Sequence, residues 1–414
     1  MVDPLRDQRP GPPSGGAGRL GPAAAFWVVA AAFTMVMAFS TVPTALYPAY
    51  VVAEGFGPFT ITVVFSVYVI GVLTSLLLAA HRSDVRGRRR LAVTALVLTL
   101  VAAVVFAGST ALPALIVARV VSGLAVGMMA PTATAWLAEL HLAARPGADR
   151  ARAEAVATTA NLGGLGLGPV LAGAVALVAA TPLRLPYVVV GMLLALALIG
   201  ILRAPETVEP VVPLPAYRPQ RPTLPATQRG RFLLSGAAVA VGFTMLGFYT
   251  SLAPSLLETG GGRLGPVVTG VVVFSVFLAA VVAQLAVRSW RPTVQVHVGL
   301  LALGTGAVPI ALAAEPASVP LLAIGGVIAG AGTGLAFRGA IGTTLELATP
   351  ERRGGTLATL YVVAYLGLTL PVLGMGILAE LVGLTGAILA FAGTVVAATV
   401  LIALGLRHVR RTAR

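Results

Sequence analysis

The stretch GLAVGMMAPTATAWLAELHLAAR (residues 123–145) decides the fold, because its landmarks return in GAGTGLAFRGAIGTTLELATPER (residues 330–352), half of the 414-residue chain later. The repeated positions are Gly123 and Gly330, Gly127 and Gly334, Glu139 and Glu346, and Arg145 and Arg352. Chance is the alternative, because the chain holds 48 glycines. In a membrane protein, two like halves predict a site between them and a rocking motion of the halves around it.

Composition identifies the solvent of this chain. Hydrophobic residues make up 57% and charged residues 10%, and the mean hydropathy is +0.95. A soluble domain carries about 25% charged residues, so this chain must face lipid, and the bilayer is its first partner. The absence of cysteine excludes thiolate and disulfide chemistry. All 28 basic residues are arginine, which together with abundant Ala, Gly and Val indicates a bacterial source.

A membrane-spanning helix needs about 20 mostly apolar residues, and twelve segments meet this requirement. They are residues 23–47, 58–80, 91–111, 113–139, 154–180, 185–203, 231–257, 266–288, 293–314, 318–347, 355–380 and 384–406. We therefore predict an all-α polytopic membrane protein with two pseudo-symmetric six-helix halves, at residues 23–203 and 231–406. Residues 1–22 are predicted to be a disordered tail, residues 204–230 a proline-rich linker, and residues 407–414 a basic tail.

The arginines predict the orientation in the membrane. All of them lie on one face of the predicted topology except Arg184 and Arg263, on the opposite face, and Arg119 and Arg338, inside spans. Positive loops stay in the cytoplasm, so we expect a multi-pass protein of the cytoplasmic membrane with both termini and the linker cytoplasmic. The net charge of +14 is then a topology signal, and a nucleic-acid partner is not expected.

Three motifs resemble those of the major facilitator superfamily. The loop Asp84-Val-Arg-Gly87-Arg-Arg-Arg90 is similar to the family's signature loop between spans two and three. Span four carries Arg119-x3-Gly123-x3-Gly127, and span five carries Gly164-x3-Gly168-Pro169-x2-Ala172-Gly173, which resembles the antiporter motif of the drug and metabolite efflux branch. Two positions depart from the pattern, Ala80 and Ala172, where the family has glycine. The resemblance implies the major facilitator fold.

The same loop predicts a conformational latch at the cytoplasmic face. Its members are Asp84, Gly87, Arg88, Arg89, Glu139, Arg145, Glu346 and Arg352. Gly87 allows a tight turn, and Asp84 can accept N–H bonds from a helix N-terminus. The family resemblance nominates the start of span eleven, near Gly355 and Thr356, for that contact. The alternative is that these charges only orient the protein.

Glycines in span five predict close helix packing. Gly164 and Gly168 are four residues apart, Gly173 follows, and Pro169 bends the helix. A nucleotide-binding loop is excluded, because no lysine follows and the segment lies in lipid.

Arg119 and Arg338 are the first candidates for a central cavity, because an arginine inside a span is costly without a partner or water. The alternative is that each caps carbonyls at a broken helix. Aromatic and polar residues of the spans that line the cavity in the family are further candidates for substrate contact. They are Phe39, Thr44, Thr132, Phe243, Tyr249 and Phe337, with Tyr361 and Tyr365 one turn apart in span eleven.

The most favoured function is a secondary active transporter that exports a small amphipathic molecule by proton antiport and alternating access. An uptake carrier or facilitator without proton coupling is the alternative, because no carboxylate lies in the middle third of any span. A membrane sensor or scaffold is a remote alternative. An enzyme is disfavoured, because four scattered histidines and no cysteine form no catalytic constellation. No cofactor or metal is expected, and a monomer suffices for function.

Overall fold

The computed structural model describes residues 20–78, 86–208, 221–225, 228–262, 265–349 and 352–412. Asp84, the tail up to residue 19 and residues 209–220 and 226–227 of the predicted linker lie outside the described residues.

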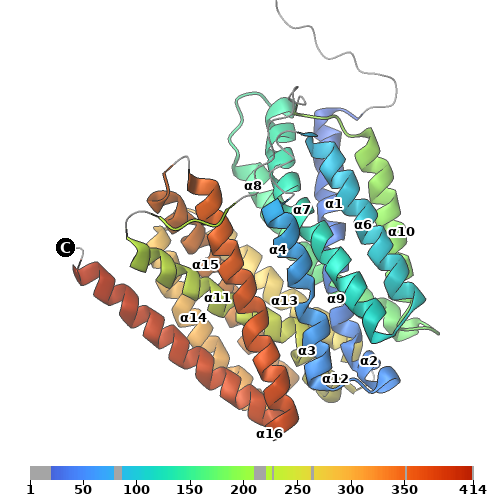
Figure 1. The fold of residues 1–414 in the computed structure, drawn as a ribbon, viewed down its shortest axis with the longest axis vertical. Helices are drawn as coiled ribbons and strands as arrows, with labels where there is room; N and C mark the ends of the chain where they lie inside the picture. The colour runs from blue at the N-terminus through green and yellow to red at the C-terminus, as the bar shows by residue number, and fades with distance from the viewer. Residues whose placement is uncertain are drawn as a thin grey trace, which may run out of the picture.

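The described chain is helical. Its elements are α1 (Pro22–Thr41), η1 (Val42–Leu46), α2 (Tyr47–Glu54), α3 (Pro58–Ser66), α4 (Tyr68–Leu78), α6 (Arg88–Gly108), α7 (Leu112–Ala144), α8 (Ala151–Thr158), η3 (Thr159–Gly163), α9 (Gly164–Val178), α10 (Leu185–Arg203), α11 (Arg229–Ser251), α12 (Ala253–Gly261), α13 (Gly265–Ala286), α14 (Pro292–Ala313), α15 (Val319–Leu347) and α16 (Arg353–Thr412). Elements α1 to α10 form the N-half and α11 to α16 the C-half (Figure 1).

Within the described residues, eleven helical runs are long and apolar enough to cross a membrane. The last run holds two of the predicted spans, because Gly383 has φ 79° and ψ 165° and interrupts the 60-residue α16. A glycine adopts this conformation without the steric cost that a side chain would add. The two limbs of α16 meet at the bottom of the view in Figure 1. The prediction of an all-α polytopic protein is confirmed.

The repeated glycines pack the same helix pair in each half. A Cβ on Gly123 would overlap the carbonyl oxygen of Tyr68, so α7 lies directly against the α3–α4 span. In the C-half, a Cβ on Gly330 would overlap the carbonyl oxygen of Val276, so α15 lies as closely against α13. Gly127 and Gly334 make the next contact along each pair. The sequence repeat is therefore a repeat of helix packing.

The glycines of span five lie at two helix interfaces, one with α1 and one with α13. Gly164 and Gly168 of α9 leave room for the backbone of α1, with the Gly164 Cβ position 2.7 Å from the Thr34 oxygen. Gly173 meets the carbonyl of Pro266, and Gly270 of α13 lies against Pro169, so this end of the motif packs against the C-half. Close contact of α9 with α13 joins the two halves.

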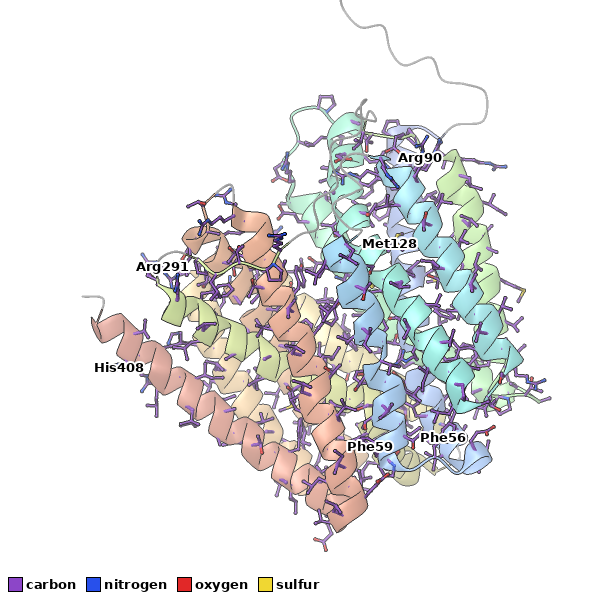
Figure 2. All side chains as sticks on the ribbon, in the orientation of Figure 1. Phe56, Phe59, Arg90, Met128, Arg291 and His408 are labelled. Carbon is purple, nitrogen blue, oxygen red and sulfur yellow. The ribbon has the colours of Figure 1, made fainter. Side chains whose placement is uncertain are left out.

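The halves meet most closely at the end away from the arginine-rich loops, called here the far end. Thr44 Oγ1 donates to the carbonyl of Thr250 at 3.1 Å, and the backbone N–H of Phe59 donates to Glu380 Oε1 at 3.3 Å. These are the hydrogen bonds that the described residues make directly between the halves. Figure 2 shows Phe56 and Phe59 at the far end and Arg90 at the opposite end, called here the basic end.

Candidate solute-binding cavity

A cavity of about 670 Å³ lies between the two halves. Its lining runs from Thr44 and Thr250, where the halves touch, to Arg88, Arg150 and Gly354 at the basic end. The cavity is therefore closed toward the far end and reaches the basic end. Its size suits a small organic molecule.

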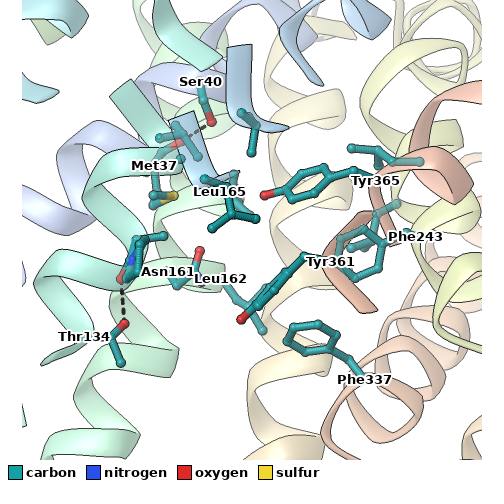
Figure 3. A pocket seen from close by; sticks show the side chains of 18 of the residues that line it. Met37, Ser40, Thr134, Asn161, Leu162, Leu165, Phe243, Phe337, Tyr361 and Tyr365 are labelled. Carbon is teal, nitrogen blue, oxygen red and sulfur yellow. Dashed lines mark hydrogen bonds between the residues drawn. The ribbon is translucent and has the colours of Figure 1, made fainter. Parts of the chain in front are cut away.

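The C-half contributes an aromatic wall. The ring centroids of Phe243 and Phe337 are 5.5 Å apart, those of Phe243 and Tyr365 5.9 Å, and those of Phe337 and Tyr361 6.0 Å. The hydroxyl ends of both tyrosines point toward Leu162 and Leu165 on the opposite wall (Figure 3). Neither hydroxyl donates to another described residue, so both are available to a bound molecule.

The N-half contributes a mixed wall of polar, aliphatic and aromatic residues, which includes Met37, Ser40, Phe65, Tyr68, Thr134, Asn161 and Leu165. Asn161 lies in η3, a π-helical turn between α8 and α9. A π turn inserts one residue into an α-helix and is common at functional sites. The Asn161 amide makes no hydrogen bond within the described chain, so the turn presents an unused amide at the cavity wall.

Arg119 is a deeply buried charge of this wall, with 2% of its surface exposed. Its Nε donates to the carbonyl of Val64 at 3.1 Å and one terminal nitrogen to the carbonyl of Ser40 at 2.6 Å. The other terminal nitrogen donates to Tyr47 Oη at 2.7 Å. Val64 and Ser40 stand near the breaks in the first two spans, so the guanidinium caps carbonyls at broken helices.

Aromatic rings surround the same guanidinium. Its carbon is 5.4 Å from the ring centroid of Tyr68, 5.7 Å from Phe65 and 6.0 Å from Tyr47. These distances allow cation–π attraction. No carboxylate among the described residues pairs with Arg119, so its positive charge is balanced only by neutral dipoles.

The basic end of the cavity carries charges of both signs. Glu154 and Arg150 line it from the start of α8, and Arg88 lines it from the start of α6. Arg88 is paired with Glu139 at 2.8 Å. Glu154 is the carboxylate that lines the cavity among the residues the structure describes.

The predicted latch residues pair within the halves in this conformation. Arg88 binds Glu139 in the N-half, while Glu346 binds Arg231 in the C-half at 2.7 Å. Arg145 and Arg352 are exposed. The separation has a physical reason, since the cavity reaches this end between the halves. A latch that forms in another conformation stays a prediction, and Asp84 lies outside the described residues.

Glu206, which follows α10, caps the N-terminus of α6. Its carboxylate accepts from the backbone N–H of Arg88 at 2.8 Å and of Arg89 at 3.0 Å. A carboxylate at this position satisfies orphan donors and the helix dipole of α6. Gly87 precedes the helix with φ 100°, and a Cβ there would overlap Glu206. The glycine of the loop thus serves the turn and the cap together.

The structure brings together five of the predicted cavity residues with Thr44. They are Arg119, Phe243, Phe337, Tyr361 and Tyr365. Four other candidates lie outside the lining. Phe39 packs against Phe106 and Tyr187 inside the N-half, Thr132 is buried in α7, Tyr249 donates to the carbonyl of Leu322 at 2.7 Å, and Arg338 is half-buried on α15.

The direction of each side chain around its helix axis explains why Thr132 and Arg338 lie outside the lining. On α7, the lining residues Gly127, Ala130, Pro131 and Thr134 form one face, and Thr132 lies on another. On α15, the lining residues Thr333, Gly334 and Phe337 leave Arg338 turned away.

The sequence interpretation missed Glu154, Asn161 and Glu206. Glu154 follows Arg150 by one turn, and Asn161 follows Glu154 by two turns, which was a usable sign of a polar face at the start of span five. Glu206 sits beyond the last span in a proline-rich segment, and nothing local in the sequence connects it to Gly87.

Two helical halves with a cavity between them that reaches one end are the arrangement found in membrane carriers. The family profile described as Major Facilitator Superfamily matches residues 28–318. The chain belongs to this family and is a transporter of a solute. No curated protein sequence is a recognisable relative of it.

Three solved structures share the fold over nearly the whole chain. A bacterial homologue of the human lysosomal transporter Spinster, in an inward-facing and unoccupied conformation, has 16% identity and a TM-score of 0.71, over 94% of this chain and 98% of its own. A D-xylose–proton symporter has 16% identity and 0.70, over 92% and 96%. The human organic anion transporter MFSD10 has 18% identity and 0.63, over 93% and 100%. At these identities the likeness concerns the fold alone.

Proposed function

We propose that the protein exports a small amphipathic molecule across the bacterial cytoplasmic membrane by alternating access. The cavity between the halves carries this proposal, because its aromatic wall faces a mixed polar and apolar wall and its described lining reaches the basic end. If the basic end is cytoplasmic, as the arginine distribution predicts, this conformation accepts solute from the cytoplasm.

Proton antiport through Glu154 is the proposed source of energy. Among the described residues, Glu154 is the carboxylate in the cavity lining, and a titratable group in the pathway can exchange a proton for solute. The span-five glycine motif, similar to that of antiporters, also favours export. The position of Glu154 near the mouth favours an uncoupled carrier instead, so coupling needs a direct test.

A ligand has to be identified before transport is measured. Purified full-length protein would be screened against a library of small amphipathic compounds by thermal shift at two pH values. Counterflow of the best ligand in proteoliposomes then tests for a carrier, since labelled solute accumulates transiently only when its entry is coupled to the exit of unlabelled solute. A protein that binds ligand but shows no counterflow would contradict the transport proposal.

Glu154→Gln separates coupling from exchange. The variant should keep counterflow, which requires no net proton movement, and lose accumulation driven by a pH gradient. Glu315→Gln is the matched control, because Glu315 is exposed and outside the cavity lining. Accumulation by Glu154→Gln equal to that of the unaltered protein would remove Glu154 from the coupling role. Absence of pH-driven accumulation in the unaltered protein would favour the uncoupled carrier.

Orientation and oligomeric state belong to the same proposal. We expect both termini to be cytoplasmic and a monomer to carry out transport. Fusions after Arg414 to reporters active on opposite sides of the membrane test the first expectation, and periplasmic activity would contradict it. Counterflow from proteoliposomes holding on average fewer than one protein chain tests the second.

A further inference from the structure

The charge on Arg119 has no counterion within the part of the chain that the structure describes. The guanidinium donates hydrogen bonds to three acceptors, the carbonyls of Val64 and Ser40 and the hydroxyl of Tyr47, and all three are neutral. Capping of carbonyls does not by itself require an arginine at this depth. A buried, unpaired charge is costly in lipid, so the position favours a role in which an anion completes the pair.

Two N–H groups of the Arg119 guanidinium are not used in these hydrogen bonds. A guanidinium has five N–H groups, and the recorded contacts use three of them. Arg119 lines the cavity although it is almost fully buried. Two N–H groups on a planar fork suit the two oxygens of a carboxylate or a sulfonate.

The opposite wall suits the rest of such a molecule. Phe243, Phe337, Tyr361 and Tyr365 form a continuous aromatic surface whose hydroxyl ends point across the cavity (Figure 3). A ring of the solute can stack there at the offset or edge-on geometry that aromatic pairs prefer. The wall holds no charged side chain, so it contributes shape and apolar contact without selecting for a charge.

We propose that the cavity selects an organic anion with an aromatic body, its carboxylate or sulfonate bound by Arg119 and its ring held by the tyrosine-bearing wall of the C-half. This inference rests on the proposed solute cavity but not on transport or proton coupling. Arg150 and Arg88 at the mouth add positive charge along the way in, although Glu139 and Glu154 offset part of it. The electrostatic preference therefore arises in the deep part of the cavity.

A single introduced thiol can measure this preference without any ligand. The chain has no cysteine, so Leu165→Cys places one reactive group on the wall opposite Tyr365. Its reaction rates with an anionic and a cationic methanethiosulfonate of similar size would be compared with those of a free thiol. We expect the anionic reagent to be favoured, and Arg119→Gln to lower the anionic-to-cationic ratio by about tenfold.

Two controls make the rate ratio interpretable. Arg203→Gln removes an exposed arginine outside the cavity lining and should leave the ratio unchanged. Arg119→Lys keeps the charge and should keep most of the ratio, even though it loses the planar fork. Two results would overturn the proposal. The first is an anionic-to-cationic rate ratio for Leu165→Cys, with Arg119 unchanged, that equals the ratio for a free thiol. The second is a ratio that Arg119→Gln leaves unchanged although the variant still melts cooperatively.

Binding of matched probes provides a test that does not depend on any variant folding. Calorimetry on the full-length protein would compare 2-naphthoate, neutral 2-naphthamide and cationic 2-naphthylmethylammonium. We expect 2-naphthoate to bind at least about tenfold more tightly than either isostere, the difference that one good charged contact contributes. Equal affinities, or tighter binding of the cation, would contradict the proposal. Inorganic sulfate should not compete at the same concentration, and competition would mean that the ring contributes nothing.

The outcomes also separate this inference from the proposed function. Preferential binding of 2-naphthoate without counterflow would retain the anion site and reject the carrier. Counterflow of a cationic or neutral ligand, with no preference for 2-naphthoate, would retain the carrier and reject the anion site.

Discussion

The two halves share their packing but differ at the position where the N-half holds its buried charge. Gly123 and Gly330 let the same pair of helices touch in each half. Half a chain after Arg119 stands Gly326, and the space beside it is filled by the ring of Tyr249, 2.9 Å from where a Cβ would lie. The guanidinium in one half and the phenol in the other both donate to main-chain carbonyls.

This difference shows how a repeated scaffold can hold a charge at a position in one half and a ring at the equivalent position in the other. Packing positions stay the same because a side chain there would collide with main chain, which cannot move aside. The neighbouring positions face space that either a charge or a ring can fill. At the cavity itself, the N-half places Arg119 and Asn161 together with the rings of Phe65 and Tyr68, whereas the C-half places rings and no charged side chain among the described lining residues.

The largest expected effect tests the shared packing. Gly123→Ala and Gly330→Ala should each lower stability by about 1–3 kcal/mol, the usual cost of overpacking, because each new Cβ overlaps a carbonyl oxygen. Gly393→Ala is the control, since its Cβ would meet no atom within 4 Å. Thermal melting of the purified variants measures the effect. A loss at one glycine only would break the equivalence of the halves.

The two ion pairs at the basic end should differ in strength. The side chains of Arg88 and Glu139 are 9% and 31% exposed, against 23% and 46% for Arg231 and Glu346. Arg88→Gln should cost about 2 kcal/mol, between the values for exposed and buried pairs. Arg231→Gln should cost less than about 1 kcal/mol. Melting temperatures of both variants, at low and high salt, check the order, and a reversed order would contradict it.

Substitutions of Tyr249 and Arg119, the hydrogen-bond donors near the position where the two halves differ, should have different effects: the first on stability and the second on binding. Tyr249→Phe removes the bond to Leu322 and should cost about 1 kcal/mol. It should leave 2-naphthoate binding unchanged, because Tyr249 lies outside the cavity lining. Arg119→Gln should weaken that binding. Loss of 2-naphthoate binding in Tyr249→Phe would show that Tyr249 contributes to the binding site.

The smallest expected effect concerns the far end. Glu380 of the C-half accepts from the first turn of α3 in the N-half, and the side chain is exposed. Glu380→Gln removes a favourable charge–dipole contact and should raise the population open to the far side by about two- to fivefold. Labelling of Thr62→Cys from that side by an impermeant thiol reagent measures it. An unchanged labelling rate would mean that α3 and α16 close without this carboxylate.

Most of the fold could be predicted from the sequence, because lipid imposes simple rules. Every span had to be a long apolar helix, and even the break at Gly383 falls between the last two predicted spans. The glycine repeat predicted two like halves, and the structure adds that these glycines pack the same helix pair in each half. These features depend on local composition and periodicity.

The cavity lining was harder to predict, because a lining residue differs from its neighbours only by its direction around the helix axis. Arg119 and Tyr361 line the cavity, whereas Arg338 and Thr132 lie one residue from lining positions, and contact of any of them with a solute stays a prediction. A span hydrophobic on all sides gives no period to orient it. Glu206 shows a second limit, since its contact with the N-terminus of α6 joins positions far apart in the chain.

The π-helical turn at Thr159–Gly163 has a consequence for comparing this chain with others. The turn amounts to one extra residue in the middle of a helix, so positions before and after it belong to different registers. An ungapped alignment with a regular helix can match either Glu154 or the glycines from Gly164 to Gly173, but not both. Homology-based transfer of cavity residues across this span therefore needs a one-residue gap, placed between Thr158 and Gly164.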